Sequence, residues 1–179
     1  MDKTLIIGLG NPDPALEATY HNVGALAVQW IAEHAAEDAA DTTGKPTFRA
    51  HKDSFAYIKT GSYIFVRPLT YMNESGRAVH DAMRVFDAKP EDIIVIHDDS
   101  DIPVGEFKRT TGGGSAGHNG IRSVIDHLHT QDFARIRIGI RAPDEAHRKK
   151  AGDFVLSPIT PADKKVFENV FEKIFASFF

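Results

Sequence analysis

Short, continuous apolar runs alternate along the chain with segments in which apolar residues recur at helical spacing. The runs at residues 4–10 (TLIIGLG) and 92–97 (DIIVIH) are typical of strands buried on both faces of a sheet. Apolar residues recur every three or four positions from His21 to about residue 37, and again from Ser75 to Asp87, which predicts two helices. Strands and helices are therefore expected to alternate.

Shorter patterns predict the elements that lie between and after these. Residues 47–69 alternate in polarity and break at Gly61, which predicts a hairpin or two paired strands. An edge strand at 105–111 precedes a flexible glycine-rich turn and a helix from about 119 to 129. Residues 133–140 alternate aliphatic residues with arginine, as a strand with one solvent-facing side does.

The last helix is predicted to begin at Thr160, a suitable N-cap, with Pro161 at the first helical position. Its apolar stripe is expected to pack onto the domain, and Phe178 and Phe179 could instead meet a neighbouring molecule. Together these elements predict a single three-layer α/β domain over residues 1–179. Its sheet is expected to be mixed, mostly parallel and twisted, with helices on its faces.

The composition is that of a folded domain. Of 179 residues, 42% are hydrophobic and 26% are charged, which is enough for a buried core. The absence of cysteine excludes disulfides and thiol catalysis. The N-terminal apolar run is too short for a signal peptide and no run approaches the length of a membrane span, so we expect a cytoplasmic protein without membrane association.

Charge is distributed unevenly along the chain. The net charge of −4 argues against a protein that coats nucleic acid indiscriminately. Residues 106–150 nevertheless hold nine Lys or Arg against five Asp or Glu, so this window carries +4 and the rest of the chain −8. Taken alone, the window is better explained by chance clustering on a solvated face than by a binding surface.

The glycine-rich stretch GLGNP after the first predicted strand could bind the phosphate of a small nucleotide. A dinucleotide-binding fingerprint needs glycine where Asp13 stands, and Pro12 lacks the amide N–H that a phosphate cradle uses. The chain also has no G-x-x-x-x-G-K-[ST] motif. Nucleotide binding is therefore a weak hypothesis.

Nine histidines raise the question of a metal site. His97 lies close to Asp98, Asp99 and Asp101 in sequence, but no zincin spacing is present, and without cysteine a structural zinc site is not expected. We expect neither a metal nor a cofactor. The histidines interpreted as ordinary surface residues are His34, His51, His80 and His147.

His21 stands apart because it precedes a predicted helix close to the glycine-rich turn. A histidine that acts as a general base needs a carboxylate to orient its ring, and Asp98 at the end of the neighbouring buried strand is the natural partner. Without cysteine or a nucleophile elbow there is no obvious nucleophile, so water is expected to attack directly. Asn11, Asn73 and Asn119 fall in loops or helix openings, where each is more often a cap or turn residue than a ligand.

Seven segments, taken in their order along the chain, resemble the bacterial-type peptidyl-tRNA hydrolases, and the resemblance extends over nearly the whole chain. The family cleaves the ester that joins a peptide to the 3′-terminal ribose of tRNA, and the resemblance implies the same function here. The matching segments are LIIGLGNP, ATYHNVG, RPLTYMNESG, IVIHDDSDIPVG, GGGSAGHNGIRSVI, FARIRIGI and the FVL at 154–156.

The resemblance also implies roles for individual residues. His21 would activate water, Asp98 would hold its ring, and Asn11 would position the water or steady the oxyanion. The substrate's peptide would be held by Asn73, Asn119, His118 and Tyr71. Neutral amides prefer an acylated α-nitrogen over a free ammonium, which would protect aminoacyl-tRNA. The family's C-terminal region suggests that the last helix could cover the site.

The same resemblance changes the interpretation of the basic window, because tRNA becomes the expected partner. Arg137 would help to clamp the 5′-phosphate of tRNA, and we expect the enzyme to act as a monomer. Phosphate contacts position a nucleic acid without reading its sequence, which suits an enzyme that accepts almost every tRNA. The residues expected to bind tRNA are Lys108, Arg109, Arg137 and Arg141.

Four positions depart from the family pattern and weaken the expected hold on tRNA: Asp13, Leu16, Tyr20 and Thr110. Thr110 replaces a second phosphate-binding Lys or Arg, and Arg109 points to the other face if its strand is regular. The basic run at 147–150 (HRKK) could compensate, although a solvated loop is the simpler interpretation. The alternative function is an RNA-binding module that keeps the fold without the activity.

Overall fold

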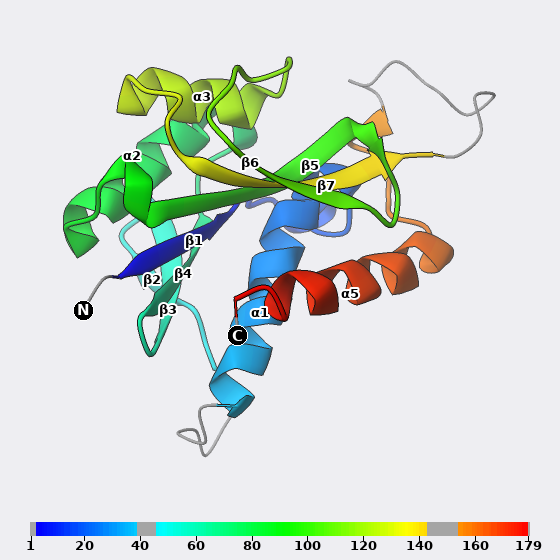
Figure 1. The fold of residues 1–179 in the computed structure, drawn as a ribbon, viewed down its shortest axis with the longest axis horizontal. Helices are drawn as coiled ribbons and strands as arrows, with labels where there is room; N and C mark the ends of the chain where they lie inside the picture. Colours follow the sequence, from blue (N-terminus) through cyan, green and yellow to red (C-terminus); the bar gives the residue numbers. More distant parts are fainter. Residues whose placement is uncertain (1–2, 39–45, 143–153, 179) are drawn as a thin grey trace.

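The computed structural model describes residues 3–38, 46–142 and 154–178 (Figure 1). The strands are β1 (Thr4–Gly8), β2 (Arg49–His51), β3 (Phe55–Thr60), β4 (Tyr63–Pro68), β5 (Ile93–Pro103), β6 (Phe107–Thr111) and β7 (Ala134–Arg141). The helices are α1 (Val23–Asp38), α2 (Ser75–Phe86), α3 (Asn119–Leu128) and α5 (Pro161–Phe175). Short 3-10 turns are η1 (Pro14–Leu16), η2 (Tyr20–Asn22), η3 (Met72–Glu74) and η4 (Pro90–Asp92).

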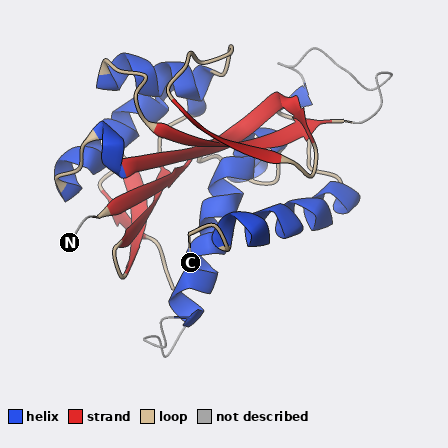
Figure 2. Ribbon diagram, viewed as in Figure 1, coloured by secondary structure: helices blue, strands red, loops and turns tan. Residues whose placement is uncertain are grey.

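The seven strands form one sheet in the order β2-β3-β4-β1-β5-β7-β6. The four central strands β4, β1, β5 and β7 pair in parallel, and β2, β3 and β6 add antiparallel pairings at the two ends. Helices α1 and α5 cover one face and α2 and α3 the other (Figure 2). The expected three-layer α/β fold with a mixed sheet is confirmed.

Side chains alternate strictly between the two faces of the central strands. Ile94 and Ile96 of β5 belong to the core beneath α1 and α5, whereas Ile93 and Val95 belong to the core beneath α2 and α3. The pairing of β5 with β7 shows that the same alternation continues beyond the apolar part of β5. Asp98 pairs with Ile138 of the α1 side, and residue 97 pairs with Arg137 on the α3 side.

The acidic cluster lies within a strand, so the prediction that the strand ends at residue 97 is wrong. β1 stops at Gly8, opposite Ile96, but β7 continues to pair with β5 through Asp99. β5 therefore projects beyond β1 and is paired on one side only. The projecting part no longer needs apolar side chains on both faces, which is why its sequence turns polar while the strand continues.

Two smaller predictions are also corrected. The segment 47–69 contains three strands, because β2, with the sequence RAH, adds a short edge strand that has no apolar run to mark it. Helix α1 begins at Val23 and not at His21, because residues 20–22 form the 3-10 turn η2. β6 does occupy an edge of the sheet, as expected.

Helix α1 starts almost in contact with the backbone of β5. A Cβ atom on Gly24 would lie 2.3 Å from the carbonyl oxygen of Ile96, and one on Gly8 would lie 2.3 Å from the carbonyl oxygen of Gly24. Only glycine fits this approach, since the obstructing atoms belong to the backbone. The contact places the residues just before α1 beside the projecting part of β5.

The C-terminal helix packs onto α1 with the side chains of the predicted stripe. Phe167 and Ile174 are buried, and Thr160 caps the helix by accepting a hydrogen bond from the Asp163 amide at 3.1 Å. Residues 147–150 and Phe179 lie outside the described residues. In the ranges that are described, no helix is long and apolar enough to span a membrane.

Candidate active site

The turn before α1 is fixed to the turn after β1 by one side chain, Asn22. Its Oδ1 accepts a hydrogen bond from the Asn11 amide at 2.8 Å, and its Nδ2 donates to the Asn11 carbonyl at 3.0 Å. The amide and the carbonyl of Asn11 in the GLGNP turn are therefore already used, which disfavours phosphate binding to them. Asn22 was not identified from the sequence, where a single asparagine at a helix opening looks like an ordinary cap.

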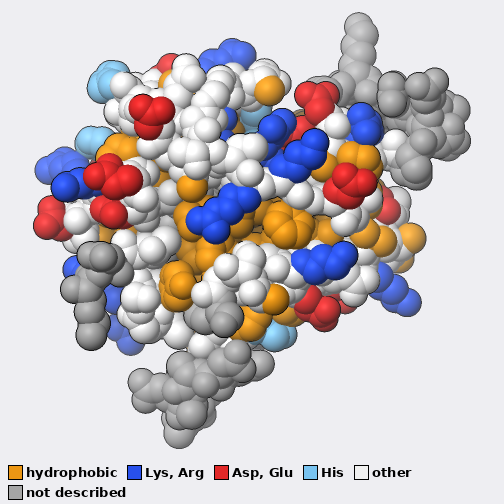
Figure 3. All heavy atoms as spheres, viewed as in Figure 1, with side chains coloured by type: hydrophobic (Ala, Val, Ile, Leu, Met, Phe, Trp, Pro, Cys, Tyr) orange, Lys and Arg blue, Asp and Glu red, His pale blue; other side chains and the backbone are white. Residues whose placement is uncertain are grey.

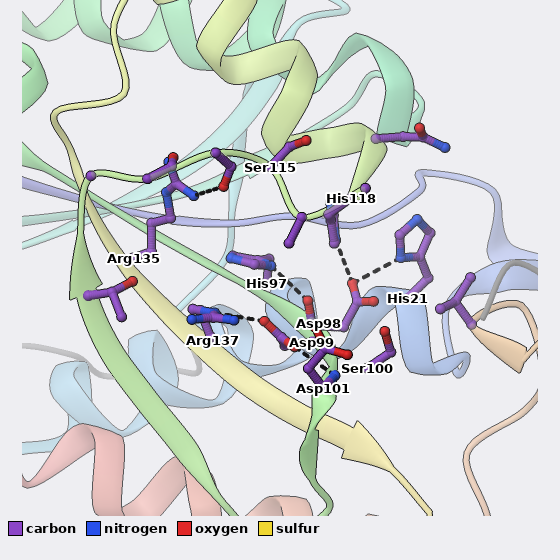
Figure 4. A pocket seen from close by; sticks show the side chains of 18 residues that line it. His21, His97, Asp98, Asp99, Ser100, Asp101, Ser115, His118, Arg135 and Arg137 are labelled. Atoms are coloured by element: carbon purple, nitrogen blue, oxygen red, sulfur yellow. Dashed lines mark hydrogen bonds and ion pairs between the residues drawn. The ribbon is translucent and has the colours of Figure 1, made fainter. Parts of the chain in front are cut away.

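His21 lies in the 3-10 turn η2, and its own backbone amide donates to the Val155 carbonyl at 2.8 Å. Its Nδ1 lies 2.9 Å from Oδ1 of Asp98 (Figure 4). An ionised carboxylate only accepts hydrogen bonds, so Nδ1 of the neutral ring carries the proton and Nε2 keeps its lone pair. The structure thus brings together the histidine and the carboxylate that the sequence paired.

The same oxygen of Asp98 also meets a second imidazole. Nε2 of His118 lies 2.8 Å from Oδ1 of Asp98, whose residue is only 3% exposed. Burial alone would raise the pKa of the Asp98 carboxyl, but the contacts with His118 and then His21 outweigh it and hold that pKa well below its ordinary value. Asp98 is therefore ionised at neutral pH.

A third histidine adjoins this cluster. Nδ1 of His97 donates to the backbone carbonyl of Asp98 at 2.7 Å. Chiefly through burial, and also through the neighbouring His118, the pKa of His97 is lowered from 6.5 to about 3. His97 is thus a neutral residue on the α3 face of β5, whereas Asp98 projects toward the other face of this strand.

His21, Asp98 and His118 offer ligand atoms within 4.8 Å of one another, as a metal site would. Nδ1 of His118, however, accepts a hydrogen bond from the Ile121 amide at 3.2 Å, so Nε2 of the neutral ring holds the proton. A metal at this cluster would have to displace that proton. The hydrogen bonds account for the three side chains without a metal.

A cavity of about 450 Å³ opens beside the cluster, between β7 and the loop at 112–117. Arg137 lines it and donates from Nε to Oδ2 of Asp99 at 2.7 Å, and the other oxygen of Asp99 accepts from the Asp101 amide at 2.8 Å (Figure 4). The guanidinium is therefore held at Nε by a carboxylate that is itself fixed.

Arg135 lies on the same face of β7 and was not assigned a role from the sequence. Its residue is 4% exposed, and its guanidinium donates to the carbonyl oxygens of Gly113 and, at 2.8 Å, Gly114. It thereby fixes the start of the glycine-rich loop. The spacing of two residues from Arg137 placed both arginines on one face, but did not indicate that one of them is buried.

Asn11, expected to position the water or steady the oxyanion, contacts the segment that carries two of the residues expected to hold a peptide. Oδ1 of Asn11 accepts from the Met72 amide at 2.9 Å, which leaves its NH₂ group as the outward donor. Tyr71, 53% exposed, and exposed Asn73 flank Met72. Exposed Asn119 begins α3 and lines the cavity, whereas Asn11, Tyr71 and Asn73 lie outside its walls.

The basic residues expected to bind tRNA are divided between the two faces of the sheet. Lys108 pairs in register with Arg137 and shares its face, but Arg109 pairs with Ile136, which is buried beneath α1 and α5. Arg141 ends β7 and is half-buried, outside the cavity. Lys and Arg side chains gather over the β6–β7 end of the sheet on the face drawn in Figure 3.

Two of the positions that depart from the family pattern, Asp13 and Tyr20, make hydrogen bonds within the protein. Asp13 caps η1 through the Ala15 amide at 2.9 Å. Tyr20 is 2% exposed, stacks on Phe154 with ring centroids 4.5 Å apart, and donates its hydroxyl hydrogen bond to Asp163. Burial, and then the Asp163 carboxylate, raise the pKa of Tyr20. Tyr20 therefore ties the turn that carries His21 to the start of α5.

Burial of neutral His97 predicts a specific loss of stability in acid. Because the unfolded chain binds a proton near pH 6.5 and the folded chain only near pH 3, stability falls as pH drops through this window, by up to about 1.4 kcal/mol per pH unit. His97→Asn keeps a donor for the Asp98 carbonyl and removes the titration. The free energy of unfolding, measured with urea at pH 6, 5 and 4, should fall less steeply with decreasing pH in His97→Asn than in wild type. Exposed His80→Asn should keep the wild-type pH dependence. An equal pH dependence in His97→Asn and in wild type would contradict the assignment.

The chain is similar to known proteins over most of its length. The family model described as peptidyl-tRNA hydrolase matches residues 5–178. The chain is 36% identical over 177 residues to the peptidyl-tRNA hydrolase of Mycolicibacterium gilvum, covering 96% of this chain and 86% of the relative. It is 41% identical over 172 residues to that of Lactobacillus delbrueckii subsp. bulgaricus, covering 95% and 88%.

A solved structure supports the same assignment. The crystal structure of peptidyl-tRNA hydrolase from Acinetobacter baumannii superposes with a TM-score of 0.79 at 28% identity, over 98% of this chain and 86% of that one. Family model, relatives and fold agree over nearly the full length. The chain belongs to the peptidyl-tRNA hydrolase family.

Proposed function

We propose that this enzyme hydrolyses the ester between a peptide and the 3′-terminal ribose of tRNA by direct attack of a water molecule that His21 activates. The observation that carries the proposal is the 2.9 Å contact between Nδ1 of His21 and Oδ1 of buried, ionised Asp98. It fixes the ring so that Nε2 is the proton acceptor. No observation favours an inactive RNA-binding module.

Asp98 assists in two ways. Its hydrogen bond selects the tautomer with the lone pair on Nε2, and its negative charge stabilises the imidazolium that forms when water loses its proton. A buried carboxylate acts strongly on an adjacent cation because little water screens it. His21 can then give this proton to the departing ribose oxygen. Because water itself is the nucleophile, no covalent intermediate forms.

Asn11 would act on the ester carbonyl or on the attacking water. Its Oδ1 is engaged by the Met72 amide, and its backbone is held by Asn22, so its NH₂ group has a fixed direction. A preorganised donor of this kind stabilises the oxyanion of a tetrahedral intermediate or holds the attacking water. Removing one such donor typically costs about 100-fold or more in turnover.

The peptide and the tRNA would contact different residues around the cluster. Tyr71, Asn73 and Asn119 present exposed polar groups for the peptide, and neutral amides suit an acylated nitrogen. Arg137 and Lys108 share a face beside the cavity and would contact tRNA phosphates. We propose that the enzyme works as a single-domain cytoplasmic monomer without metal or cofactor.

Replacing His21 with alanine tests the base. His21→Ala should lower turnover of N-acetyl-aminoacyl-tRNA by at least about 100-fold, because a positioned general base contributes on that order. Release of free tRNA measures the rate, and circular dichroism verifies folding. His80→Ala, at an exposed histidine, should remain fully active. A His21→Ala protein as fast as wild type would refute the mechanism.

The two faces of β6 and β7 provide a matched test of tRNA binding. Arg137→Gln keeps a donor for Asp99 but removes the cation, so KM for blocked aminoacyl-tRNA should rise about tenfold while kcat changes little. The wild-type KM should also increase with salt. Arg109→Gln, on the opposite face, should leave KM near the wild-type value. Equal effects of the two variants, or a KM independent of salt, would exclude this clamp.

A further inference from the structure

We infer that His118 is a positioning residue that holds Asp98 and makes no contact with the substrate, although the sequence suggested such a contact. The inference rests on the proposed hydrolysis at His21. Both ring nitrogens of His118 are already used within the protein: Nε2 meets Oδ1 of Asp98 at 2.8 Å and Nδ1 meets the amide of Ile121 at 3.2 Å. Neither atom remains for a ligand.

The two partners of His118 determine where its proton lies. A backbone N–H can only donate, so Nδ1 must present its lone pair to Ile121. The Asp98 carboxylate can only accept, so Nε2 must carry the hydrogen. Only the neutral Nε2–H form satisfies both contacts, because a second proton on Nδ1 would face the Ile121 donor. His118 therefore has neither a free lone pair nor a proton for the reaction.

Packing keeps this ring in place. Its side chain is 10% exposed, and the ring lies between two other imidazoles, with centroids 4.9 Å from that of His21 and 4.8 Å from that of His97. A Cβ atom on Gly120 would lie 3.1 Å from Cε1 of His118. The same Cβ atom would lie closer still to Sδ of Met72, at 2.5 Å, so glycine at 120 relieves crowding among several side chains that include this ring.

Holding Asp98 has two consequences for the site. A carboxylate with one hydrogen bond can rotate, but one that receives two donors on the same oxygen keeps that oxygen directed at His21. His118 is also the N-cap of α3, so the helix that begins with Asn119 is fixed to the catalytic carboxylate. One ring thereby sets both the orientation of the base and the position of a predicted peptide contact.

Three substitutions separate the two hydrogen bonds of His118. Asparagine is a good N-cap but too short to reach Asp98, glutamine can present an amide N–H near the position of Nε2, and alanine provides neither contact. We expect kcat for N-acetyl-aminoacyl-tRNA to fall at least about tenfold in His118→Asn and in His118→Ala, with substantial recovery in His118→Gln. KM should stay within about threefold of wild type in all three.

Thermal unfolding provides the second measurement. His118→Asn should unfold at a higher temperature than His118→Ala, because only asparagine keeps the cap. A stable His118→Asn with low kcat and unchanged KM would therefore support positioning. A raised KM with unchanged kcat would show a substrate contact, and an unchanged kcat in His118→Asn would show that the Asp98 contact is unimportant; either overturns the inference.

The wild-type protein distinguishes this inference from the proposed function. If wild type releases no tRNA, the proposed hydrolysis itself fails, whatever the variants do. If wild type is active and His21→Ala is not, the His118 variants test the positioning role alone.

Discussion

One buried oxygen, Oδ1 of Asp98, accepts hydrogen bonds from two imidazoles that lie just before α1 and α3, helices on opposite faces of the sheet. Burying a carboxylate is costly unless charge-assisted hydrogen bonds compensate. The two histidines supply that compensation and in return are held in defined tautomers. The rest of the site depends on keeping these three side chains together.

The fold meets this requirement by the way its elements end. β5 projects beyond β1, which opens a gap through which His21 approaches from the α1 side and His118 from the α3 side. Gly24 lets α1 start against the backbone of Ile96, two residues before Asp98. Strand alternation then separates the tasks, since Asp98 serves the proposed chemistry while Asp99, on the other face, holds Arg137 beside the cavity.

Hydrophobic periodicity predicted most of this architecture, because buried strands and amphipathic helices each have a characteristic pattern of apolar residues in the local sequence. It missed β2 and the outer half of β5, whose strand conformation comes from pairing with β3 and β7 and not from apolar side chains. The pairing of His21 with Asp98 was predictable because both flank buried elements. The contacts of Asn22 and Arg135 were not, since each depends on backbone atoms that only the folded chain brings near. The contact of His118 with Asp98 joins side chains from separate elements and left no local signal either.

Nitrogen-15 NMR of the histidine side chains tests the central claim most directly, because it reads which ring nitrogen carries the proton. At a pH where the rings are neutral, the account predicts opposite tautomers for the two partners of Asp98: Nδ1–H for His21 and Nε2–H for His118. Finding His21 as the Nε2–H tautomer would contradict it, since the nitrogen that must accept the proton of water would already be occupied.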